Sequence, residues 1–268
     1  MFSKQEFQDW VGENAVPFAA VMTKIEGRKD DDLLRTYEFR GFPSMAILDA
    51  GGEAITKKVP RDLFSMQNIV AAATVYPKLK ATLDAGEPVD EKAWLMAQLR
   101  MGDLSAEDAA AEIEAVGLTG EDKALAARLL LVLQTSELWH KATARDSSDA
   151  DRKAAREQVW ADFKAGKRLP AGTSPESFVD GVVIDMAKET NDKEAFFFAY
   201  ERVAAGLKER LAQLEGLVPR YRTMIDEAGD DEKKLELAKR SQERLDGAIE
   251  IVERELAELD AFAAKLRG

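Results

Sequence analysis

The chain has 268 residues, of which 46% are hydrophobic and 33% charged, a balance typical of a globular protein large enough for one large or two medium domains. Its 50 acidic and 38 basic residues give a formal net charge of −12, which argues against nucleic acid as a partner, because a phosphate-binding surface needs a concentrated basic face. No apolar run approaches the roughly 18 residues that a membrane-spanning helix needs, so we expect no membrane partner.

The first predicted elements are a helix, a buried strand and a second, short helix. Ser3 followed by Glu6 forms a capping-box pattern, which predicts a helix over residues 2–10. The mostly apolar run 16–25, which contains β-branched residues, is typical of a buried central strand. Residues 30–37 favour a short helix, because acidic side chains stand where the dipole of a helix favours negative charge.

A proline followed by a β-hairpin comes next. The proline lies in the tetrapeptide Gly41, Phe42, Pro43 and Ser44. We expect a strand over 45–48, a turn over 49–52 in which glycine supplies the positive φ, and a returning strand over 53–59. A helix over residues 65–84 would pack against this sheet.

In this order the elements resemble the second half of a thioredoxin fold. The resemblance covers residues 1–86 and implies a proline, usually in a cis peptide, that faces the active-site cysteines. It places Gly41, Phe42, Pro43 and Ser44 in the substrate-facing groove, with Ser44 where threonine is more usual. The alternative is an unrelated small α/β unit that contains Gly-x-Pro before a hairpin.

The chain contains no cysteine, whereas thioredoxin chemistry needs a thiolate nucleophile. The family's Cys-x-x-Cys turn precedes the helix that residues 2–10 resemble, so this segment is absent rather than mutated. Three explanations stay open: a gene start assigned at an internal methionine, an upstream selenocysteine codon read as a stop, or natural truncation. A sheet without its first strand would have to close up, or be completed by another part of the chain or by a second copy.

Residues 87–200 have the composition of helices. The predicted helices cover 92–100, 105–116, 119–138, 148–165 and 176–190. Residues 169–175 form the clearest loop, and the helix pair that begins at residue 176 resembles one unit of a tetratricopeptide-type repeat. An irregular helical bundle is the alternative, since no strict repeat period is present.

Residues 201–268 predict an antiparallel coiled-coil hairpin. Apolar residues recur there at alternating spacings of three and four on two segments joined by Gly229. Pro219 lies inside the first arm, where we expect it to kink or split the helix. A hairpin of this kind has one apolar stripe on each helix, and we favour a homodimer through residues 201–268.

The predicted fold class is therefore α+β and mainly α: an incomplete thioredoxin-like domain, a helical-repeat-like domain and a helical hairpin. We predict no catalytic residue, metal site or cofactor, since His140 is the only histidine and no phosphate-binding glycine loop is present.

The favoured function is a redox-inactive thioredoxin-like protein that binds a protein partner or client polypeptide. The alternative is a truncated thiol–disulfide oxidoreductase whose active site lies upstream of Met1. The sequence as written indicates a cytoplasmic protein, and an upstream start would favour a periplasmic or secreted one.

Overall fold

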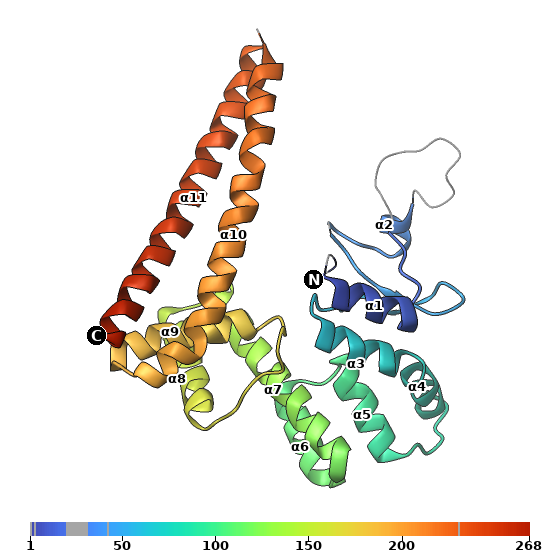
Figure 1. The fold of residues 1–268 in the computed structure, drawn as a ribbon. Helices are drawn as coiled ribbons and strands as arrows, with labels where there is room; N and C mark the ends of the chain where they lie inside the picture. The colour runs from blue at the N-terminus through green and yellow to red at the C-terminus, as the bar shows by residue number, and fades with distance from the viewer. Residues whose placement is uncertain (1, 3, 20–31, 42, 230) are drawn as a thin grey trace. The chain divides into compact units, whose positions relative to one another are not determined.

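The computed structural model describes every residue except Met1, Ser3, residues 20–31, Phe42 and Asp230. The described chain is mostly helical and contains one sheet, which has two antiparallel strands (Figure 1). It divides into two compact units, Met1–Ala155 with Ala165–Glu176, and Arg156–Lys164 with Ser177–Gly268. The mainly helical fold class is therefore confirmed.

The first unit begins with two helices, α1 (Gln5–Asn14) and α2 (Leu33–Thr36). The N-cap of α1 is Lys4, which provides no side-chain cap, and the predicted cap Ser3 lies outside the described residues.

The predicted strand over residues 16–25 is wrong in the part that the structure describes. Residues 16–19 belong to no strand, and Val16 and Phe18 are 95% and 67% exposed. A β-branched, apolar run becomes a buried strand only when a neighbouring strand pairs with it. The described residues provide no such neighbour for this segment, and the rest of the predicted strand lies outside them.

The predicted β-hairpin is confirmed. Strand β1 (Ile47–Leu48) pairs with β2 (Ala54–Thr56), with an irregularity in register between the two residues of β1. The Asp49 carboxylate shapes the turn by accepting hydrogen bonds from the backbone N–H groups of Gly51 and Glu53, at 2.8 and 2.9 Å. Gly52 has a φ of +85°, which side chains disfavour, so the sequence encodes this turn locally.

Two helices replace the single helix predicted over residues 65–84. They are α3 (Leu63–Ala73) and α4 (Tyr76–Asp84), and Pro77 lies in the first turn of α4. Proline has no N–H to donate and disfavours the helical conformation in the residue before it, so it is tolerated at the start of a helix and not inside this one.

The core of the first unit forms around α5 (Glu91–Met101), which packs against α3, α4, α6 (Ala106–Val116) and α7 (Gly120–Thr143). Its buried side chains include Leu95, Met96 and Leu99. A second cluster joins Met101 and α3 to Ile47 and Ile55 of the hairpin. The small sheet is thus held by apolar contact with a helix, which two strands need because they are marginal alone.

A buried carboxylate ties a distant loop to the start of α3. Asp62 is 3% exposed; its Oδ1 accepts from the backbone N–H of Ser65 at 2.8 Å and caps α3. Its Oδ2 accepts from the N–H and hydroxyl of Ser174, at 3.2 and 2.8 Å, so the loop at residues 169–175 is fixed against an element 112 residues earlier.

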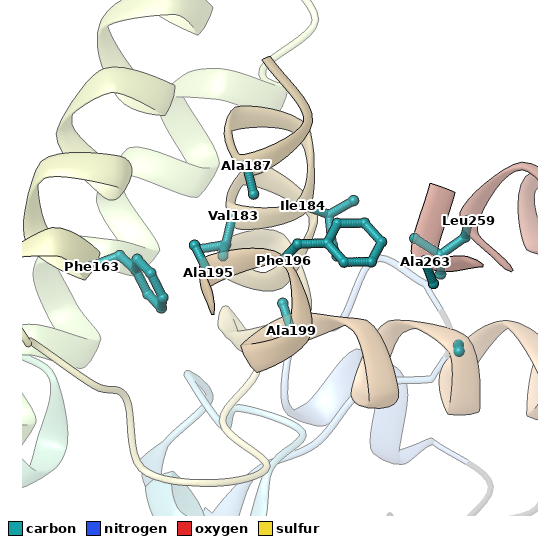
Figure 2. Packing of buried hydrophobic residues seen from close by; sticks show 10 residues of the cluster. Phe163, Val183, Ile184, Ala187, Ala195, Phe196, Ala199, Leu259 and Ala263 are labelled. Atoms are coloured by element: carbon teal, nitrogen blue, oxygen red, sulfur yellow. The ribbon is translucent and has the colours of Figure 1, made fainter. Parts of the chain in front are cut away.

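The second unit has a core of side chains from four helices (Figure 2). The helices are α8 (Asp149–Lys164), α9 (Glu176–Thr190), α10 (Lys193–Ala228) and α11 (Glu232–Arg267). Phe196 is fully buried at the centre, whereas Phe198 is 39% exposed, with the guanidinium of Arg202 at 4.5 Å from its ring centroid. The same guanidinium donates two hydrogen bonds to the buried carboxylate of Asp180, at 2.8 and 2.6 Å.

Helices α10 and α11 form the predicted antiparallel hairpin (Figure 1). The buried residues of α11 all follow the predicted seam: Ala238, Leu245, Val252, Leu259 and Ala263. The expected split at Pro219 is wrong, because α10 continues through it as one helix. Helix α10 packs against α11, and Pro219 itself is exposed. Helix α10 also runs unbroken through residues 200 and 201.

Candidate functional site

A surface hollow of about 220 Å³ lies beside the proline of the Gly-x-Pro segment. Its lining side chains are Phe39, Pro43, Ser44, Met45, Lys57, Val59 and Arg61. They come from the segment between α2 and β1 and from the segment after β2, so the two flanks of the hairpin build the hollow together.

A hydrogen bond joins these two flanks, and two others order the backbone near them. The Arg61 guanidinium donates to the carbonyl oxygen of Pro43 at 2.9 Å, across 18 residues of sequence. The Ser44 hydroxyl donates to the carbonyl oxygen of Gly41, which turns the backbone around the proline. The Tyr37 hydroxyl donates to the carbonyl oxygen of Gly52 at 2.7 Å and fastens the end of α2 to the hairpin turn. Arg61 therefore links the segment after β2 to the backbone at Pro43.

The hollow combines positive charge with apolar surface. Lys57 and Arg61 supply two cations, and Phe39, Met45 and Val59 supply apolar atoms. Lys57 Nζ lies 3.4 Å from a Glu38 carboxylate oxygen, but the two side chains are 43% and 84% exposed. Exposed ion pairs of this kind contribute at most about 1 kcal/mol, so a ligand carboxylate can replace Glu38 at little cost.

Three of the four predicted groove residues are described, and all three are exposed. Pro43 and Ser44 line the hollow, and Gly41 supplies the carbonyl that orients Ser44. Phe42 lies outside the described residues.

Sequence reasoning missed Phe39, Met45 and the three side chains that follow β2. These three, Lys57, Val59 and Arg61, are spaced by two residues, the period at which side chains of an extended chain point to the same side. That spacing was the available signal. Phe39 and Met45 carried no comparable signal, since they stand in an irregular segment.

A hydrogen-bonded pair, Tyr76 and Asp103, lies next to the β-hairpin. The Tyr76 hydroxyl donates to an Asp103 carboxylate oxygen, and Lys58 Nζ lies 3.9 Å from the other oxygen of the same carboxylate. Burial raises the pKa of Tyr76 to about 12, and the hydrogen bond to the Asp103 carboxylate acts in the same direction because it stabilises the neutral phenol.

The described residues include no group of three or more His, Cys, Asp or Glu side chains arranged to hold a metal ion. The ring of His140 stacks on that of Trp139, with centroids 5.6 Å apart.

In the described part of the chain, no helix is both long and apolar enough to cross a membrane. The chain also contains no thiol, so it cannot itself exchange disulfides.

Comparison of the chain with protein-family models, with curated proteins and with solved structures gave no match. Within the described residues, the fold is mainly helical, with one small β-hairpin and a long helical hairpin near the C-terminus.

Proposed function

We propose that this chain is a redox-inert interaction protein whose thioredoxin-like N-terminal region binds an extended segment of a client polypeptide beside Pro43. The observation that carries the proposal is the hollow at Pro43, which offers cations and apolar side chains in a chain without cysteine. The order of α1, α2, Pro43, the hairpin and α3 supports the thioredoxin-like assignment, although the described part of the expected strand at residues 16–25 departs from it.

The chemistry of the hollow favours an acidic residue beside an apolar one in the client. Lys57 and Arg61 can bind a carboxylate, and the apolar lining covers a neighbouring aliphatic side chain. A glutamate next to a leucine in an extended chain satisfies both requirements. The protein as a whole carries a net charge of −12, so a local pair of cations would favour an acidic client segment at this place.

Two fluorescein-labelled peptides of equal length test this proposal, one with glutamate and one with lysine at matched positions beside leucine. We expect fluorescence anisotropy to show binding of the glutamate peptide, weakened at least several-fold by the pair Lys57→Ala and Arg61→Ala. The control pair Arg35→Ala and Lys78→Ala removes the same charge from exposed positions outside the hollow and should leave binding unchanged. Equal affinity for both peptides, or equal loss in both variants, would contradict the proposal.

The alternative proposal, a truncated thiol–disulfide oxidoreductase, is favoured by the exposure of Pro43, since an added nucleophile could approach it. The nucleotides before the Met1 codon distinguish the two. An in-frame Cys-x-x-Cys or selenocysteine variant, together with insulin reduction by the longer product, supports the enzyme. Insulin reduction above background by the chain as given would contradict the redox-inert proposal.

We also propose that the protein forms a homodimer through residues 201–268. Apolar side chains that remain exposed on the outside of the α10–α11 hairpin support this, because the hairpin seam itself is already filled. Sedimentation velocity should show a dimer at micromolar concentration, and only monomer at high micromolar concentration would rule it out.

A further inference from the structure

Glu38 has an unfavourable backbone conformation. Among the described residues, two that are not glycine have a positive φ, Glu38 and Asn191, both at +54°. Asparagine tolerates this left-handed conformation, whereas glutamate disfavours it. Just after α2, the backbone N–H of Glu38 donates to the carbonyl oxygen of Arg35, and that of Phe39 donates to the carbonyl oxygen of Leu34. These two bonds form a Schellman motif, in which glycine is the usual residue at the position that Glu38 occupies.

This helix end brings three consecutive side chains to the β-hairpin and its hollow. The Tyr37 hydroxyl donates to the carbonyl oxygen of Gly52, and the Phe39 ring lines the hollow. Between them, Glu38 Oε2 accepts from Lys57 Nζ at 3.4 Å, across 19 residues of sequence. Because Lys57 also lines the hollow, the strained residue holds its carboxylate on a cation of the candidate site.

Stability does not explain why a glutamate stands at this position. Both side chains of the Glu38–Lys57 pair are exposed, so the pair contributes little to folding. Glycine at residue 38 would remove the backbone strain at no steric cost. Strained residues of this kind cluster at binding and active sites. The property that distinguishes this pair is its place, because it occupies a cation that a client's carboxylate would use.

We propose that Glu38 is a built-in competitor that occupies Lys57 in the absence of a client and lowers the affinity of the hollow for carboxylates. An acidic client gains Lys57 only by replacing Glu38, so it exchanges one exposed ion pair for another. A carboxylate alone is then too weak a ligand, and binding requires the neighbouring apolar side chain as well. The inference rests on the client-binding function proposed above and adds a control of its affinity.

Glu38→Gln tests this proposal, because it removes the competing charge and keeps the size of the side chain. By fluorescence anisotropy at physiological ionic strength, the dissociation constant of the glutamate peptide should fall by about two- to fivefold, the range that an exposed ion pair allows. A peptide with glutamine in place of that glutamate should bind Glu38→Gln and the original chain equally.

Glu53→Gln is the matched control. It removes the same charge from an exposed side chain of the same hairpin that does not line the hollow. Screening by salt limits the effect of a charge outside the site, so the dissociation constant of the glutamate peptide should stay within about 1.5-fold of the original value.

A double-mutant cycle shows whether the charge acts through Lys57. In a Lys57→Ala background, Glu38→Gln should no longer change the dissociation constant of the glutamate peptide. Glu38→Gly is a second variant that also relieves the left-handed backbone. It should raise the affinity as much as Glu38→Gln does, and it alone should raise the temperature of unfolding.

The outcomes separate this inference from the client-binding proposal. Tighter binding in Glu38→Gln that disappears with Lys57→Ala supports competition, as does binding that only Glu38→Gln makes measurable. Competition is overturned, with client binding intact, if Glu38→Gln leaves the affinity unchanged, if Glu53→Gln raises it equally, or if the gain persists without Lys57. Failure of both the original chain and Glu38→Gln to bind the glutamate peptide overturns both proposals.

Discussion

The α10–α11 hairpin and the N-terminal region up to residue 62 differ in how well the apolar pattern of the sequence predicts which side chains are buried. In the hairpin, every buried residue of α11 lies on the predicted seam, and the seam of α10 runs from Val203 to Ala228. In the N-terminal region, α1 buries one described side chain, α2 buries none, and Phe18 is 67% exposed. The three-and-four spacing of apolar residues is enough to predict which face of a helix is buried in a hairpin. Burial of a strand depends on which other strand pairs with it, and its own sequence does not contain that information.

The largest expected effect contrasts a core side chain with an exposed one of the same type. Phe196→Ala should lower the free energy of unfolding by about 3–5 kcal/mol, because a fully buried ring leaves a cavity. Phe18→Ala should change it by less than about 0.5 kcal/mol, since that ring has little packing to lose. Urea titrations followed by circular dichroism measure both, and a similar loss in the two variants would remove the contrast between the regions.

The next prediction concerns the hydrogen bonds that join Asp62 to the loop at residues 169–175. Asp62→Ala removes the α3 cap and leaves the half-buried N–H and hydroxyl of Ser174 without this acceptor, so we expect a loss of about 2 kcal/mol. The control Asp90→Ala removes an exposed cap with one hydrogen bond, to the N–H of Ala93, and should cost about 1 kcal/mol. Equal losses in urea titrations of the two variants would show that Ser174 adds nothing to the cap.

Pro219 gives a prediction of the opposite sign for the hairpin. The proline interrupts the backbone hydrogen bonds of α10 without filling a packing position, because it is exposed. Pro219→Ala should therefore raise the free energy of unfolding, by about 2 kcal/mol after allowance for the greater freedom of the unfolded chain. Differential scanning calorimetry should show a higher transition temperature for the variant. A lower one would mean that the proline has a role in the native hairpin that its exposure does not indicate.

The smallest predicted effect is a change of stability with pH at the contact of Tyr76 with Asp103. The pKa of Tyr76 is raised to about 12 in the folded protein from an ordinary value of 10.0, so the folded state holds this proton more strongly than the unfolded state. The resulting stability is fully present below pH 10 and is lost as pH rises through about 12.

Phenolate absorbance at 295 nm measures this titration. Tyr76→Phe should remove one late-titrating tyrosine, and Asp103→Asn should lower the pKa of Tyr76. Tyr200 serves as an internal reference, because its hydrogen bond to Asp260 also raises its pKa and neither variant touches it. An unchanged late phase in both variants would show that Tyr76 and Asp103 do not interact.

The sequence by itself determined the features that depend on neighbouring residues: the Asp49–Gly52 turn and the seam of the hairpin. These follow from spacings of two to four residues, at which a side chain reaches its own backbone or one face of its own helix. The prediction that Pro43 belongs to the candidate site came from the resemblance to a thioredoxin fold and not from local spacing.

Only the tertiary structure decided which residues meet across long stretches of chain. Arg61 and Phe39 line the hollow from opposite flanks of the hairpin, and Ser174 reaches Asp62 across 112 residues. It also decided that the described part of the run 16–25 stays exposed and that α10 passes unbroken through Pro219. The physical reason is the same in each case: burial and long-range hydrogen bonding depend on which surfaces are brought together, and no local spacing in a single sequence records that.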